Sequence, residues 1–200
     1  MSDNIATPQI IGIGSSAGGL KALQVLVSQL TSDFNFSYII AQHLSPNHQS
    51  NMVKLLAKHS NLNVISAVDD IRIEKNRIYV CPENCNITVQ DGRLKLSEPD
   101  ENQSAIPNIN KLLCSLATMS GAKSIGVIFS GVGSDGAIGM MAIKQAGGKT
   151  IIQSPEQAQY DGMPKAALAQ VDIDYSVNTE ELATTFKTIL ANDLITGENE

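Results

Sequence analysis

The sequence lacks long apolar stretches and clusters of basic residues, and each absence argues against a class of function. No segment approaches the ~20 consecutive apolar residues that a membrane-spanning helix needs. The N-terminal MSDNIATPQ has neither the basic nor the apolar region of a secretory signal. The formal net charge of -6, with no Lys/Arg-rich run, disfavours nucleic-acid binding because phosphate contacts dominate that affinity. We therefore expect a cytoplasmic protein that neither inserts into a membrane nor binds nucleic acid.

Cysteines are also scarce. The three present, Cys81, Cys85 and Cys114, are too few for a disulfide framework. Cys81 and Cys85 lie four residues apart, but no nearby histidine or further cysteine completes a set of metal ligands. We expect reduced thiols that pack as small apolar groups, and we expect neither a metal nor a cofactor.

Apolar residues, in contrast, make up 42% of the 200 residues, which is enough for one large domain with a sizeable core. We expect a single domain over residues 1–200, with its core at about 10–190 and a tail at 191–200. Short apolar runs alternate with segments whose apolar residues recur at helical spacing. This alternation is typical of an α/β fold with a doubly wound, mostly parallel sheet and helices on both faces.

The expected elements follow from these patterns. Residues 86–96 change in character: two alternating segments flank a turn at 90–92, which predicts a small antiparallel β-hairpin. The other predicted strands are 10–13, 34–42, 62–65, 77–81, 124–129, 150–153 and 173–176. The predicted helices are 20–30, 50–59, 106–119, 137–146, 164–169 and 178–190.

The stretch 10–30, IIGIGSSAGGLKALQVLVSQL, predicts a strand, a tight turn of small residues and a helix. Such a turn places backbone N–H groups at a helix N-terminus, where negative charge is stabilised. GSSAG at 14–18 matches the G-x-S-x-G turn that presents a nucleophilic serine. GIGSSA at 12–17 loosely matches a dinucleotide-binding fingerprint. A turn that needs small residues only for packing is the third interpretation, and this stretch alone does not decide among them.

Three polar residues, Ser16, His43 and Asp135, each follow an apolar run at the expected carboxyl end of a strand. If those strands are neighbours, the side chains converge on one crevice, where the sites of such sheets lie. A serine hydroxyl needs an adjacent base to act as a nucleophile, and a carboxylate behind the imidazole orients it and stabilises its cation. His48 and His59 are rival bases, but His43 lies nearest to a strand end.

Each of the three residues also has a structural explanation. Ser16 and Asp135 can serve as helix caps, and His43 can be a strand-end histidine bonded to backbone. That all three residues have only a structural role is less expected than that any one of them does. The chain order Ser, His, Asp differs from that of the α/β-hydrolases, which argues against that superfamily but not against catalysis.

A second glycine loop, SGVGSDG at 130–136, precedes the predicted helix 137–146 and again has G-x-G-x-x-G spacing. A dinucleotide site also needs an acidic residue at the end of the next strand, but the strand after the first loop ends AQH at 41–43. No Walker lysine follows either loop. Nucleotide binding is therefore a minor interpretation.

Taken together, these blocks resemble the catalytic domain of the chemotaxis receptor methylesterase family, CheB. The resemblance covers about residues 10–176 and is carried by residues 11–19, QH at 42–43 with Pro46, YVCP at 79–82, SGVGSDGA at 130–137 with GM at 139–140, QAGG at 145–148 and GMP at 162–164. It implies Ser16 as nucleophile, His43 as base and Asp135 as the orienting carboxylate. The implied reaction is hydrolysis of γ-glutamyl methyl esters on the cytoplasmic helices of chemoreceptors, with deamidation of receptor glutamines in some members.

In such a reaction Ser16 attacks the ester carbonyl, His43 takes and returns the proton, and backbone N–H groups hold the oxyanion. We expect those donors to be Ala17, at the helix start, and Val132, in the second glycine loop. The expected partners are the methylated cytoplasmic domain of a receptor and, if the chain belongs to a longer signalling protein, its other domains. The alternative is a catalytically silent regulatory module that binds receptor helices or a signalling partner through the same crevice.

The sequence departs from the family pattern in several places. The family usually carries an N-terminal receiver domain that blocks the site until it is phosphorylated, whereas the first predicted strand here begins near Ile10. We therefore expect a catalytic domain without its receiver, active without phosphorylation. The loop after His43 lacks a second proline and an aromatic residue, the next helix has Lys54-Leu55 in place of the usual arginine, and 106–110 is less acidic. These differences concern substrate identity and docking more than the chemistry.

Overall fold

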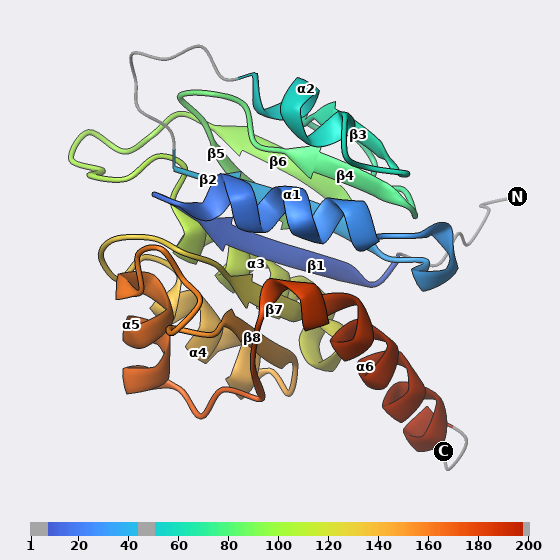
Figure 1. The fold of residues 1–200 in the computed structure, drawn as a ribbon. Coiled ribbons are helices and arrows are strands. Elements are labelled where there is room, and N and C mark those ends of the chain that lie inside the picture. The colour runs from blue at the N-terminus through green and yellow to red at the C-terminus, as the bar shows by residue number, and fades with distance from the viewer. Residues whose placement is uncertain (1–7, 44–50, 198–200) are drawn as a thin grey trace, which may run out of the picture.

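A computed structural model describes residues 8–43 and 51–197, and its centre is a seven-stranded sheet (Figure 1). The strand order is β3-β4-β2-β1-β7-β8-β9, and all the strand pairs of this sheet are parallel in the part of the chain that is described. The strands are β1 (Ile10–Ser15), β2 (Ser37–Gln42), β3 (Asn63–Ser66), β4 (Arg77–Val80), β7 (Ile125–Ile128), β8 (Lys149–Gln153) and β9 (Tyr175–Val177). The chain first places β2, β3 and β4 on one side of β1, with β3 at the edge and β4 between β3 and β2, and then returns to place β7 against the other side of β1. The prediction of a doubly wound parallel sheet is confirmed.

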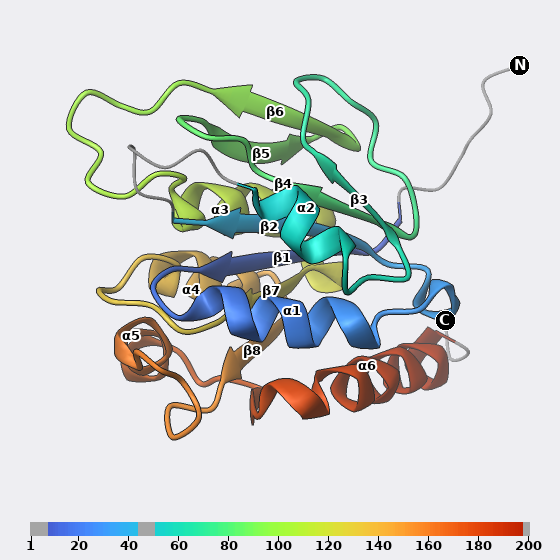
Figure 2. The ribbon, with the colours of Figure 1, turned by 45° about the horizontal axis from the view of Figure 1, so that its top comes forward.

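Helices cover both faces of this sheet (Figures 1 and 2). One face carries α1 (Gly19–Gln29), α2 (Met52–Ala57) and α6 (Leu182–Gly197). The other carries α3 (Ile109–Ser120), α4 (Ala137–Gln145), α5 (Gly162–Gln170) and the predicted hairpin, formed by β5 (Asn86–Gln90) and β6 (Arg93–Ser97). Short 3₁₀ turns are η1 (Ser32–Phe34), η2 (Gly121–Lys123) and η3 (Thr179–Glu181). None of the described helices is long and apolar enough to cross a bilayer.

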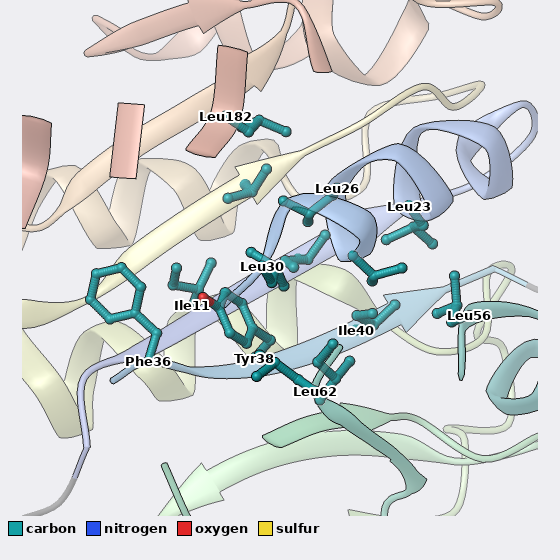
Figure 3. Packing of buried hydrophobic residues seen from close by; sticks show 14 of the residues in the cluster. Ile11, Leu23, Leu26, Leu30, Phe36, Tyr38, Ile40, Leu56, Leu62 and Leu182 are labelled. Atoms are coloured by element: carbon teal, nitrogen blue, oxygen red, sulfur yellow. The ribbon is translucent and has the colours of Figure 1, made fainter. Parts of the chain in front are cut away.

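Burial on both faces explains why the strands are continuous apolar runs in the sequence. In β2, Tyr38 and Ile40 belong to the core under α1 and α6, whereas Ile39 belongs to the core under α3. Leu23, Leu26 and Leu30 form one buried stripe along and just beyond α1, and Figure 3 shows them packed with the sheet. The sheet therefore has a separate apolar core on each side.

Several element boundaries differ from those predicted. The strand expected over 34–42 begins only at Ser37, because Phe34 lies in η1 and Asn35 has a left-handed φ of 54°. The helix expected from 106 begins at Ile109, since the Asn108 side chain accepts a hydrogen bond from the Lys111 N–H and caps the helix there.

The last helix is longer than expected. We predicted its end at residue 190 and a tail at 191–200, but α6 continues to Gly197. No glycine or proline interrupts it before Gly197, so the backbone has no local reason to leave the helical conformation earlier. Pro46, His48 and the start of the helix predicted over 50–59 lie outside the described residues.

Candidate active site

The carboxyl ends of β1, β2 and β7 lie side by side at the switch point of the sheet, between β1 and β7, from which strands are added in opposite directions. The His43 N–H donates to the Ser15 carbonyl (2.9 Å), which sets His43 beside the end of β1. The Ser16 N–H donates to the Ser130 carbonyl (2.9 Å), which joins β1 to the loop after β7. The three strands that precede Ser16, His43 and Asp135 are therefore neighbours, as the triad hypothesis requires.

The two consecutive serines have different environments. Ser15 is fully buried, and its hydroxyl donates to Gln42 Oε1. Ser16 is half-buried, and its hydroxyl makes no hydrogen bond to any residue in the described part of the chain. A Cβ on Gly131 would come within 2.8 Å of Ser16 Cβ, so only glycine leaves room beside this serine. Of the two hydroxyls, Ser16 is the one available to a substrate.

Gln42 links the ends of β1 and β2. Its Oε1 accepts the Ser15 hydroxyl, and its Nε2 donates to the Ser16 carbonyl (2.8 Å) and the His43 carbonyl (3.0 Å). The amide is buried, with only 8% of the residue exposed. We predicted no role for Gln42 from the sequence, although an amide at the end of a buried apolar run is a signal that was available.

His43 and Asp135 are in contact: His43 Nε2 lies 2.9 Å from Asp135 Oδ2, and both side chains are mostly buried. Asp135 Oδ2 also accepts from the Ile109 N–H (2.8 Å), and Oδ1 accepts from the Asn110 N–H (3.0 Å). Burial disfavours the ionised Asp135, but the hydrogen bonds from His43, Ile109 and Asn110 outweigh it and hold its pKa below the usual value. This carboxylate is thus an anion at neutral pH.

Asp135 caps α3, which precedes it in the chain; of the helix that follows, it accepts only the N–H of the N-cap residue Gly136 (2.9 Å). Its carboxylate accepts the first N–H groups of α3, where the positive end of the helix dipole stabilises a negative charge. The capping interpretation considered from the sequence pointed to the helix after Asp135, and that assignment was wrong. Capping and contact with His43 coexist in one carboxylate.

The contact with Asp135 leaves Nδ1 as the ring nitrogen of His43 that can face Ser16. An ionised carboxylate accepts a hydrogen bond from Nε2–H, so Nδ1 carries the lone pair that a general base needs. Within the described residues no hydrogen bond joins Ser16 Oγ to His43; catalytic hydrogen bonds are often long before substrate binds. His59 is exposed beyond the end of α2, and His48 lies outside the described residues.

Two backbone N–H groups, one next to Ser16 in the chain and one next to Gly131, have no acceptor in the described residues. The N–H groups of Ala17 and Val132, the two expected oxyanion donors, bond to no other residue among those described. The Ser130 side chain donates to the Ala17 carbonyl (2.8 Å) and accepts from the Tyr160 N–H (3.0 Å). Ser130, for which the sequence predicted no role, thereby fixes the turn after β1 against the segment before α5.

An open cavity of about 710 Å³ borders the His43–Asp135 pair. Its walls are the loop 132–135, the start of α3 and the acidic segment 100–105. It is large enough for a glutamate side chain and part of the backbone that carries it.

The glycines of the first fingerprint have a packing role. A Cβ on Gly12 would lie 2.9 Å from Leu113 Cδ2, and one on Gly14 would lie 2.3 Å from Ile109 Cγ2. Both glycines therefore permit the close approach of α3 to β1. Helix packing therefore explains the glycine spacing at residues 12–17, and a bound pyrophosphate is not needed to explain it.

Nothing in the described chain groups three His, Cys, Asp or Glu side chains in a way that could hold a metal ion. All three cysteines are free thiols. Burial raises the pKa of Cys81 to about 12, so this thiol stays protonated.

Comparison with known proteins gives consistent results. The family model described as CheB methylesterase matches residues 11–186. A protein-glutamate methylesterase/protein-glutamine glutaminase of Carboxydothermus hydrogenoformans is 37% identical over 166 residues, which are 80% of this chain and 49% of that protein. A putative protein-glutamate methylesterase/protein-glutamine glutaminase of Leptospira interrogans is 29% identical over 187 residues, which are 93% of this chain and 97% of that protein.

The crystal structure of the Thermotoga maritima CheB methylesterase catalytic domain superposes with a TM-score of 0.84 at 26% identity. The match covers 92% of this chain and 100% of that one. The chain spans about half the length of its relatives from C. hydrogenoformans and Geobacter sulfurreducens. Since the family model matches 11–186, most of the chain, this protein belongs to the CheB methylesterase family.

Proposed function

We propose that this chain is a serine esterase that hydrolyses glutamate γ-methyl esters on the cytoplasmic helices of chemoreceptors, releasing glutamate and methanol. The observation that carries the proposal is the His43–Asp135 pair, 2.9 Å apart, at the strand ends beside the accessible Ser16 hydroxyl. The relatives' names pair a methylesterase with a glutaminase, so deamidation of glutamine is proposed as a second reaction of the same site. Such a substrate places the enzyme in the cytoplasm.

The partner is the methylated receptor domain, together with any further domains of a longer signalling protein. We propose that the chain forms one domain, because both apolar cores share the same sheet.

The proposed reaction assigns one role to each member of the triad. Ser16 Oγ attacks the ester carbonyl while its proton passes to His43 Nδ1. The Asp135 carboxylate holds the ring through Nε2 and stabilises the imidazolium. Collapse of the tetrahedral intermediate expels the alkoxide, which leaves as methanol with the proton from His43. A water molecule, deprotonated by His43, then attacks the acyl-enzyme, releases the glutamate and regenerates Ser16. With a glutamine substrate the leaving group of the first step is ammonia in place of methanol.

Negative charge on the tetrahedral oxygen needs donors that are in place beforehand. The Ala17 and Val132 N–H groups are proposed for this role, because Ala17 follows Ser16, Val132 follows Gly131, which packs against Ser16, and neither N–H has an acceptor in the described chain. Each such donor is typically worth about 10²–10³ in kcat.

The test is methanol release from a methylated receptor cytoplasmic fragment by wild type, Ser16→Ala and Ser15→Ala. We expect Ser16→Ala to lower turnover by about 10⁴-fold or more. Ser15→Ala is the matched control: it leaves Gln42 Oε1 without a donor and costs about 1–2 kcal/mol of stability, with turnover within about tenfold of wild type.

The opposite ranking, with only Ser15→Ala inactive, would assign the nucleophile to Ser15. If wild type binds the fragment but releases neither methanol nor ammonia, the esterase proposal fails and the regulatory-module interpretation replaces it.

A further inference from the structure

Asn110, the second residue of α3, forms a reciprocal capping pair with Asp135. The Asp135 carboxylate accepts the Ile109 and Asn110 N–H groups at the start of α3. In return, Asn110 Oδ1 accepts the Gly136 N–H (3.0 Å) and the Gly139 N–H (2.8 Å) at the start of α4. The start of α4 thus receives hydrogen bonds from a residue of α3, and the start of α3 receives them from Asp135 in addition to its own cap Asn108.

This exchange compensates for a missing local cap. The first N–H groups of any helix have no partner within it, and the N-cap residue of α4 is Gly136, which has no side chain to supply one. Gly136 has φ 94°, a left-handed conformation that lets the chain turn into α4 directly after Asp135. Asn110 therefore anchors the peptide that carries the catalytic carboxylate.

The charge of residue 110 also matters. The Gly136 N–H donates both to Asn110 Oδ1 (3.0 Å) and to Asp135 Oδ1 (2.9 Å), so these two oxygens are close neighbours. An amide oxygen can share this donor without a net charge of its own. A carboxylate at position 110 would set two like charges side by side, which disfavours ionisation of both.

Other charged groups around the pair are few. His43 contacts Asp135 from the end of β2, and Asp100 and Glu101 line the same cavity as Asp135. Asp100 is paired with Lys111 Nζ at 2.7 Å. Apart from His43, which is in direct contact, residue 110 is the described side chain that shares a hydrogen-bond donor with Asp135, so a charge there would act on Asp135 at close range.

We propose that Asn110 is a positioning residue: its neutral amide anchors the start of α4 so that Asp135 stays ionised and directed at His43 Nε2. The inference rests on the proposed esterase function for its catalytic consequence. It goes further by assigning a role to a residue that need not touch the substrate.

The test compares Asn110→Asp and Asn110→Ala with Asn178→Ala as matched control. Asn178 caps η3 through hydrogen bonds that stay within residues 178–181, so its loss removes a cap elsewhere. The readouts are thermal unfolding, the pH profile of kcat/KM for methanol release, and the ¹³C NMR titration of the Asp135 carboxyl group. The last does not depend on activity.

Asn110→Asp keeps both acceptor bonds, so we expect Tm within about 3 °C of wild type. The added charge shifts the Asp135 titration to higher pH and moves the acidic limb of kcat/KM up by about one pH unit. Asn110→Ala loses the cap: Tm falls by about 3–8 °C and kcat/KM falls about tenfold or more. Asn178→Ala lowers Tm similarly but leaves kcat/KM and its pH profile unchanged.

The proposal is overturned if Asn110→Asp leaves the Asp135 titration where it is in wild type. It is also overturned if Asn110→Ala behaves like Asn178→Ala, with lower Tm and unchanged kcat/KM, because Asn110 is then only a structural cap. A wild type without esterase activity refutes the proposed function instead, and the NMR titration still decides whether Asn110 keeps Asp135 ionised.

Discussion

At the scale of single residues, the ionised Asp135 carboxylate couples the site to the stability of the fold. The folded state lowers its pKa below the ordinary value of 3.8, so the unfolded state binds a proton first as the pH falls. The stabilisation is therefore fully present above about pH 5 and is lost as the pH falls through 3.8 towards the folded-state pKa.

Asp135→Asn removes this dependence. We predict that the gap in unfolding free energy between wild type and Asp135→Asn, measured by urea unfolding, is constant from pH 7 to about pH 5 and narrows below about pH 4. At neutral pH we predict a fall in kcat of about 10³–10⁴-fold, because an amide cannot stabilise the imidazolium. A gap that stays the same down to pH 3 would show that Asp135 has the same pKa in both states.

At the scale of elements, the crossing of α3 and α4 determines where the Asn110–Asp135 caps lie. Gly139 is the contact point: a Cβ there would lie 2.5 Å from Leu113 Cβ and 3.3 Å from the Asn110 backbone. Neither atom is the flexible end of a side chain, so the helices would have to separate. The closeness of these two helices is therefore a condition for the geometry of the site.

We predict that Gly139→Ala destabilises the protein by about 1–3 kcal/mol through overpacking, although alanine is the better helix former. It should also lower kcat, since moving α4 disturbs the Asn110 cap. Met141→Ala is the control on the same helix: Met141 is 36% exposed, and we expect a change within about 0.5 kcal/mol. Chemical unfolding and methanol release measure both effects. Equal unfolding free energies of wild type and Gly139→Ala would contradict this prediction and show that α3 and α4 accommodate the added methyl group without cost.

At the scale of the whole molecule, a cluster of aromatic residues that stabilises the fold lies away from the proposed active site. Phe34, Phe36, Tyr38 and Phe186 form an aromatic cluster around the start of β2, whereas the proposed site lies at its opposite end. Phe36 and Phe186 meet edge to face, with centroids 5.9 Å apart. This cluster holds α6 on the sheet.

Phe186→Ala should therefore lower stability without altering the folded enzyme. We predict a loss of about 3–5 kcal/mol from the cavity and the lost contacts, measured by urea unfolding. Below the unfolding transition, kcat per folded molecule should equal that of wild type. A large fall in kcat at full folding would show that the aromatic cluster and the site are coupled through the sheet.

Much of this architecture could be predicted from local patterns. Buried strands such as 37–42 have apolar residues on both faces, and the stripe Leu23, Leu26 and Leu30 identifies a helix over the sheet. Boundaries were less accurate where a single residue decides them, as at Asn35 with its left-handed φ or at Asn108 with its cap.

The residues of the candidate site were predictable from the sequence only in part. Ser16, His43 and Asp135 stand out because each polar residue follows an apolar run. Asn110 does not, since its role consists of bonds to backbone groups that are distant in the sequence. No local pattern distinguishes such an amide from one that is merely solvated.

The sequence by itself determined the α/β layering and the candidate polar residues at the strand ends, because burial and periodicity act over a few neighbouring residues. Only the tertiary structure decided that β1 lies between β2 and β7, that His43 Nε2 meets Asp135, and that α3 and α4 exchange caps. The caps join residues 25 to 29 positions apart and the His43–Asp135 contact joins residues 92 positions apart, so they exist only once the shared sheet and the close α3–α4 crossing have brought these groups together.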